Sequence, residues 1–190
     1  YRLLDLVALL HRLGLDQLLW FKPRCTVCTY DYRIFNADGS ESEQCGNGAL
    51  CVGYYLSRQL GLDTVTLLTY SQKIAVDCTK RQPVALIGPI QLISMSKQLL
   101  GVAVYQVGNA HAVVQVKDVE TVNVYALYHQ IQSYMHIPIN LEVYSFNCSM
   151  FRVRIFERGV GETLSCGSGL CCVAMDIFKK NKILSKVCLV

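Results

Sequence analysis

Apolar residues recur at helical intervals in the opening segment YRLLDLVALLHRLG, where Asp5, His11 and Arg12 interrupt the apolar run. This pattern predicts an amphipathic helix that stops at Gly14 and is too often interrupted to span a membrane. The segments DQLLWF and TYDYRIF predict two strands, and a second helix is expected from near Gly46 to about Leu60, with Gly61 as its stop. Short strands are predicted next at TVTLLTY, KIAVDC, PVALIG, GVAVYQV and HAVVQV.

The second half of the chain repeats this order. A helix is predicted over residues 121–134, strands at LEVYSF and FRVRIFE follow, and the turn RGVGET leads into a last apolar helix with a lysine-rich end. The similarity indicates a degenerate internal duplication that pivots between residues 75 and 100. The expected fold is therefore α+β, with two pseudo-symmetric lobes, residues 1–90 and 91–190. Each lobe would wrap strands around a central apolar helix, with an active-site cleft between the lobes.

Composition narrows the functional classes. Of the 190 residues, 52% are hydrophobic and 17% charged, which is enough for a real core. The net charge of +4 comes from 18 basic and 14 acidic residues scattered along the chain, so no nucleic-acid partner is expected. The start lacks a signal-peptide pattern and is Tyr1 rather than Met, so the chain is either processed or lacks its beginning.

The ten cysteines of the chain are interpreted as reduced thiols of a cytoplasmic protein, because a core-rich chain does not need a disulfide scaffold. Cys51, Cys171 and Cys172 fall in apolar helical patterns, where core packing is the expected role. Cys25 and Cys28 have CxxC spacing, which leaves a redox role open. They follow no thioredoxin-like pattern and have no second pair for zinc, so incidental loop thiols are the favoured interpretation and no metal is expected.

The same pattern, Cys-Gly-x-Gly, opens both apolar helices, in EQCGNGALCVGYYL and in LSCGSGLCCVAMDI. The first N–H groups of a helix are unpaired and partly positive, and glycines let an anionic ligand come close. Cys45 and Cys166 are therefore candidates for reactive thiolates with a lowered pKa. A hydrolase needs one nucleophile and a differently built base, whereas inversion of a carbon needs two like acid/base groups on opposite faces.

The pair of thiols thus predicts inversion at the Cα of an amino acid, with the helix N-termini stabilising the negative charge that builds on the substrate carboxylate. No lysine is singled out for a pyridoxal Schiff base, and no phosphate-binding loop is present in the sequence. Catalysis without a cofactor is expected.

Three blocks, FNADGSESEQCGNGALC, VGNAHAVVQVKDVET and ERGVGETLSCGSG, make residues 12–178 resemble the diaminopimelate epimerase family. The resemblance implies conversion of LL-diaminopimelate to the meso form, on the route to lysine and cell wall, without pyridoxal phosphate, by a homodimer. Carried over by motif, Cys45 and Cys166 would be the acid/base thiols, each assisted by a nearby His111 or Glu157. The residues implied in substrate binding are Gln17, Asn36, Gly46, Asn47, Asn109, Asn140, Arg158, Gly167 and Ser168.

The chain also departs from the family pattern. The family's first strand, with its Gly-Asn-Asp-Phe motif, has no counterpart here, and the strands after the second helix are largely missing, so the chain is interpreted as truncated at both ends. Ala110 stands where the family has proline, Leu50 where arginine is usual, and Leu170 where a small alanine packs. The alternative function is therefore a catalytically dead remnant of the same fold.

Overall fold

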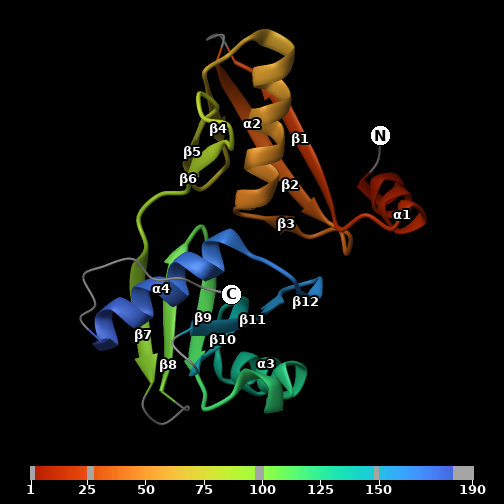
Figure 1. The fold of residues 1–190 in the computed structure, drawn as a ribbon. Helices are drawn as coiled ribbons and strands as arrows, with labels where there is room; N and C mark the ends of the chain where they lie inside the picture. Colours follow the sequence, from red (N-terminus) through yellow and green to blue (C-terminus); the bar gives the residue numbers. More distant parts are fainter. Residues whose placement is uncertain (1–2, 25–27, 97–100, 148–149, 182–190) are drawn as a thin grey trace. The chain divides into compact units, whose positions relative to one another are not determined.

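The computed structural model describes residues 3–24, 28–96, 101–147 and 150–181, which fold into two sheets and a few helices (Figure 1). The chain separates into two compact units, Tyr1–Gly88 and Pro89–Val190. The predicted α+β class with two lobes is confirmed. Among the described helices, none has the length and apolar character needed to cross a membrane.

The first unit is built on a six-stranded sheet of mixed direction. Its elements are α1 (Leu3–Leu13), β1 (Gln17–Pro23), β2 (Thr29–Asn36), β3 (Glu41–Ser42), α2 (Gly46–Leu60), β4 (Thr64–Leu68), β5 (Lys73–Asp77) and β6 (Val84–Leu86). The strand order is β1-β2-β4-β5-β6, and β3 pairs with β2 beside this path. Because β2 and β4 are parallel, the chain crosses between them through α2.

Helix α2 covers the first sheet with one stripe of residues. Ala49, Val52 and Leu56 pack with alternate residues of β2, β4 and β5, such as Ile34 and Val76. The helix ends as predicted, because Gly61 adopts a φ of 67° and its N–H reaches back to the carbonyl of Ser57.

The second unit also has a six-stranded mixed sheet, in the order β12-β11-β10-β9-β8-β7. Its elements are β7 (Gln91–Ser96), β8 (Val102–Val107), β9 (Asn109–Gln115), the 3-10 turn η1 (Val119–Thr121), α3 (Val124–Tyr134), β10 (Ile139–Asn147), β11 (Met150–Glu157), β12 (Gly161–Thr163) and α4 (Gly167–Asn181). Strands β9 and β10 are parallel and are joined through α3. The helix predicted over 121–134 begins later, at Val124, because the Asn123 side chain caps it.

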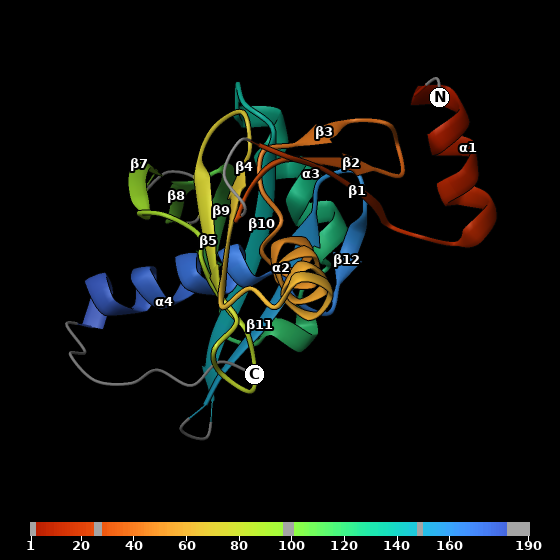
Figure 2. The ribbon, with the colours of Figure 1, turned by 90° about the horizontal axis from the view of Figure 1, so that it is seen from above.

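Alternation along the central strands gives this sheet two different faces. The apolar face, with Val104, Ala112 and Leu141, packs on Tyr128 and Ile131 of α3. The opposite face is also buried but carries polar groups, and it packs on α4. Tyr105 of β8 and Tyr144 of β10 donate hydrogen bonds from this face to the buried Asp176 of α4, at 3.0 and 2.8 Å. Figure 2 shows α3 and α4 on either side of β9 and β10.

Candidate active site

Each motif cysteine lies between a short strand and the helix that follows it. Cys45 follows β3 and caps α2, and its Sγ accepts a hydrogen bond from the Gly48 N–H at 3.3 Å. Cys166 follows β12 directly before α4, and its Sγ lies 3.3 Å from the Ser168 hydroxyl oxygen. In each unit, two paired antiparallel strands, a short strand, a thiol and a helix follow one another. This is the local repetition that the sequence predicted.

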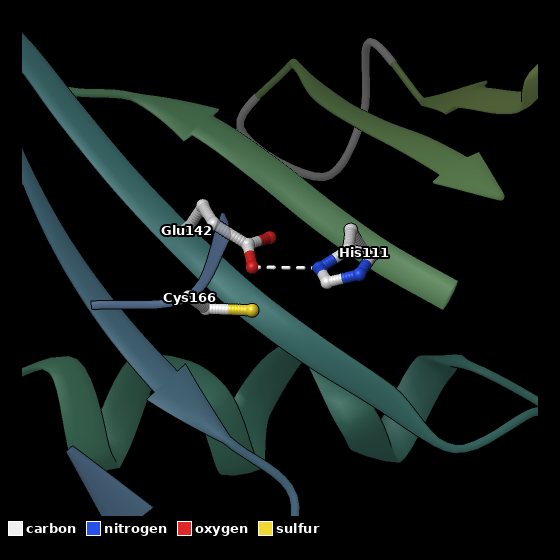
Figure 3. A group of neighbouring side chains, drawn as sticks. All are labelled: His111, Glu142 and Cys166. Carbon is white, nitrogen blue, oxygen red and sulfur yellow. Dashed lines mark hydrogen bonds and ion pairs between the residues drawn. The ribbon is translucent and has the colours of Figure 1, made fainter. Parts of the chain in front are cut away.

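Cys166 lies among three ionisable side chains of its own unit. His111 Nδ1 and Glu142 Oε1 are 2.7 Å apart, and both side chains are fully buried. The donor atoms of His111, Glu142 and Cys166 all lie within 4.8 Å of one another, and Figure 3 shows the three side chains converging from β9, from β10 and from the segment before α4. Glu157, at the end of β11, lies beside the Cys166 thiol and accepts a hydrogen bond of 2.6 Å from Thr163.

The surroundings of Cys166 contradict the prediction that this thiol has a lowered pKa. Burial first, then the charges of Glu157 and Glu142, raise the pKa of the Cys166 thiol to about 12 from its ordinary 9.0. Hydrogen bonds from Ser168 and the Gly169 N–H act in the opposite direction but are outweighed. Burial likewise raises the pKa of the Glu157 carboxyl group. Without a ligand, Cys166 therefore keeps its proton at neutral pH.

Of the described residues, His111, Glu142 and Cys166 form the one group of three whose atom types suit a zinc ion. In this structure, His111 Nδ1 and Glu142 Oε1 bond each other at 2.7 Å. This imidazole–carboxyl pair lies beside the Cys166 thiol.

The structure pairs two of the predicted substrate-binding residues of the first unit. Gln17 and Asn36 face each other across β1 and β2, and the Gln17 amide donates to Asn36 Oδ1 at 2.9 Å. Asn36 in turn donates to the Ser40 hydroxyl at 3.0 Å. Gly46 and Asn47 form the first turn of α2, directly after Cys45.

In the second unit, the predicted residues gather at one end of the sheet and at the start of α4. Asn140 lies beside His111 on the neighbouring parallel strand, and its Oδ1 accepts the Arg158 N–H at 2.9 Å. The other predicted residues lie at the first positions of β9 and α4: Asn109, Gly167 and Ser168.

The predicted roles of the other cysteines are only partly right. Cys172 is buried, as expected. Cys51 and Cys171 are exposed, so their assignment to the core was wrong, because each helix buries a single stripe and these positions lie off it. Cys28 is a free, exposed thiol, and Cys25 lies outside the described residues.

The sequence of this chain matches known epimerases over most of its length. A family model described as diaminopimelate epimerase matches residues 103–189. The diaminopimelate epimerase of Acinetobacter baumannii (strain AYE) is 32% identical over 200 residues, which cover 92% of this chain and 71% of that protein. The chain belongs to the diaminopimelate epimerase family. It is accordingly an amino-acid epimerase. The diaminopimelate epimerase of Xylella fastidiosa (strain M23) is also 32% identical, over 90% of this chain and 69% of its own length.

Solved structures show the same fold at lower identity. A predicted epimerase from Pseudomonas aeruginosa superposes with a TM-score of 0.71 at 16% identity, over 94% of this chain and 72% of that one. A hydroxyproline epimerase from Agrobacterium vitis gives a TM-score of 0.67 at 12% identity, over 91% and 62% of the two chains. The two-lobed fold of this diaminopimelate epimerase family member is therefore shared with other epimerases.

One residue of the site was missed from the sequence of this family member. Glu142 stands in LEVYSF, where a charged residue in a strand is expected to face water. It is fully buried instead, on the polar inner face that also presents His111. No signal in the sequence of β10, INLEVYSFN, could have shown this, because its first residues alternate between apolar and polar side chains, which is the pattern of a strand with one face in water.

Proposed function

We propose that this chain converts LL-diaminopimelate to meso-diaminopimelate by a two-thiol mechanism without a cofactor. The main support is the matched placement of Cys45 and Cys166, each in the same local sequence of strands and helix. Membership of the diaminopimelate epimerase family supports the choice of substrate.

In the proposed reaction, the Cys45 thiolate removes the proton from the substrate Cα, and the Cys166 thiol delivers its own proton to the opposite face of the same carbon. Cys45 ends as a thiol and Cys166 as a thiolate, so the reverse reaction uses them with exchanged roles. The assignment of Cys166 as the acid in this direction rests on its raised pKa. His111 and Glu157 both lie beside Cys166 and would take part in its proton exchange.

The negative charge that builds on the substrate α-carboxylate needs hydrogen-bond donors. The N–H groups of Gly46 and Asn47 in α2, and of Gly167 and Ser168 in α4, belong to helix first turns and would supply them. Arg158 would bind the distal carboxylate, because its guanidinium has the matching fork geometry. Gln17, Asn36, Asn109 and Asn140 would complete the substrate site with their amides.

The test is to replace each thiol and measure inversion of LL-diaminopimelate together with deuterium incorporation at Cα in heavy water. Cys45→Ala and Cys166→Ala are each expected to lose at least about 10²-fold in inversion rate. Cys51→Ala and Cys171→Ala are matched controls, because these exposed thiols lie on the same two helices. Full inversion by either Cys45→Ala or Cys166→Ala would sink the two-thiol mechanism. Wild-type protein that gives neither inversion nor deuterium incorporation would support the catalytically dead remnant.

A further inference from the structure

We propose that Glu142 is a positioning residue, which holds the ring proton of His111 on Nδ1 and so leaves Nε2 as the acceptor of the site around Cys166. The proposal deepens the proposed epimerase function and rests on it. It is carried by the contacts of the Glu142 carboxyl group and by the unpaired atoms beside it.

The contact between Glu142 and His111 is short and fully enclosed. The atoms Oε1 and Nδ1 are 2.7 Å apart, and neither side chain is exposed to solvent. Glu142 pairs with Val113 in the β9–β10 register, two residues beyond His111 on the same face of the sheet. A carboxylate oxygen is an acceptor, so the proton of this bond belongs to Nδ1, and the tautomer of a histidine follows from the bond that one nitrogen makes.

The second glycine of the thiol motif provides the space for this carboxyl group. A Cβ atom built on Gly169 would lie 2.8 Å from Glu142 Cδ and 2.9 Å from Cγ, and closer still to Oε1. Only a residue without a side chain fits there. The carboxyl group therefore rests against the first turn of α4, where the unpaired N–H groups favour negative charge. The motif that presents Cys166 thus also accommodates Glu142.

Two atoms of the pair lack a partner within the part of the chain that the structure describes: His111 Nε2 and Glu142 Oε2, both buried. A buried polar atom left unpaired costs about 1–3 kcal/mol, so a group of this kind in a folded protein calls for an explanation. With Nδ1 protonated, Nε2 is an acceptor. It can take up a proton or bind an N–H donor such as the ammonium group of an amino-acid substrate.

The ionisable groups that face Glu142 come from three segments. His111 comes from β9, Glu157 from β11, and Cys166 and Cys172 from the motif and helix α4. The negative charge of Glu142 raises the pKa values of Glu157, Cys166 and Cys172. Neutralising this charge should therefore move the pH profile of inversion to lower pH, in addition to changing the tautomer of His111.

The decisive experiment is NMR of the full chain labelled with ¹⁵N-histidine, which gives four ring systems because the chain has four histidines. The signal of His111 is identified as the one lost in His111→Asn. In the wild type, we expect neutral His111 to carry its proton on Nδ1. In Glu142→Gln, whose amide can donate to Nδ1, the proton should move to Nε2. A wild-type spectrum with the proton on Nε2 overturns the proposal, even if Glu142→Gln fails to fold.

The matched control is Asp176→Asn, because Asp176 is another fully buried carboxylate of the same unit but bonds Tyr105 and Tyr144. Both variants remove one buried charge, and only Glu142→Gln should change the His111 tautomer. Glu142→Gln should also lower kcat for inversion by about 10- to 100-fold with little change in KM, as loss of a supporting hydrogen bond does in other sites. Asp176→Asn should leave the pH profile of inversion in place.

The two proposals can fail separately. If the wild type has the predicted tautomer but does not invert diaminopimelate, the proposed function fails and the role of Glu142 in fixing His111 stands. If the wild type inverts diaminopimelate while Glu142→Gln keeps full kcat and an unchanged tautomer, Glu142 is not a positioning residue and the proposed function stands.

Discussion

Replacing Gly169 by alanine would place a methyl group against the buried carboxyl group of Glu142, 2.8 Å from its Cδ. Gly167, two residues earlier in the same turn of α4, is the matched control, because a Cβ there meets nothing within 4 Å. Neither glycine has a positive φ, so the backbone accepts alanine at both positions. The difference between Gly169→Ala and Gly167→Ala therefore isolates the contact with Glu142.

The magnitude follows from what Glu142 can do when displaced. It has no exposed surface to move into, so the methyl group either strains the packing of α4 on β10, at about 1–3 kcal/mol, or breaks the bond to His111. A hydrogen bond to a charged group contributes about 1.5–3 kcal/mol. Because alanine has a higher helix propensity than glycine, the substitution also stabilises α4 by up to about 1 kcal/mol. Because the propensity gain is common to both variants, we expect the free energy of unfolding of Gly169→Ala to lie about 1–3 kcal/mol below that of Gly167→Ala, which should itself be neutral or slightly stabilised.

Urea unfolding measures this difference, and the two units can be followed by different signals. Far-UV circular dichroism reports on both units, whereas fluorescence of Trp20, the single tryptophan, reports on the first unit. Gly169→Ala should lower the unfolding midpoint seen by circular dichroism below that of Gly167→Ala. Equal free energies of unfolding for Gly169→Ala and Gly167→Ala would refute the close contact between Gly169 and Glu142.

Two further predictions concern alkaline pH and thiol chemistry. Burial raises the pKa values of the Cys166 thiol and of the Tyr32, Tyr105 and Tyr144 hydroxyls above their unfolded values of 9.0 and 10.0. These groups contribute fully to the free energy of unfolding below about pH 9, and the contribution is lost as pH rises through their folded pKa values. The free energy of unfolding should therefore fall above pH 9. A free energy of unfolding that stays level up to about pH 11 would contradict this. With a pKa of about 12 in place of 9.0, Cys166 should react with iodoacetamide at pH 8 about 10³-fold more slowly than a cysteine peptide in the same tube, measured by mass spectrometry. Comparable rates would show that the thiol is not held protonated.

Elements with strong local signals could be predicted from the sequence. Helix α2 was predicted almost to the residue, because a turn, an apolar stripe and Gly61 mark its limits. Strand β7 was not predicted. Its sequence, QLISMS, lacks clear alternation, and it forms a strand by pairing with β8 at the edge of the sheet, with a register shift between Leu92 and Ser94. Residues 91–95 are all exposed, so no burial pattern marks this strand in the sequence, although its partner β8 is the next strand along the chain.

Local sequence signals likewise reveal some features of the site and not others. Cys45, Cys166 and the residues around His111 were found because they stand in contiguous motifs. The lowered pKa expected for Cys166 considered only the local helix terminus. The raised pKa comes first from burial and then from the carboxylates of Glu157 on β11 and Glu142 on β10, two strands that pair only when the sheet forms. Sequence motifs therefore indicated His111 and Glu157 beside Cys166 but not Glu142, and the folded sheet sets the protonation state of Cys166.

The second glycine of each motif has a further role that the sequence alone did not suggest. In the first unit, a Cβ on Gly48 would lie 2.5 Å from the hydroxyl oxygen of Tyr32, just as one on Gly169 would meet Glu142. Both glycines thus admit a polar side chain from the sheet beside the thiol. The admitted groups differ in charge, because burial raises the pKa of Tyr32 and keeps its hydroxyl neutral, whereas Glu142 adds a carboxyl group. A carboxylate repels a thiolate and a neutral hydroxyl does not. This asymmetry supports Cys45 as the base and Cys166 as the acid.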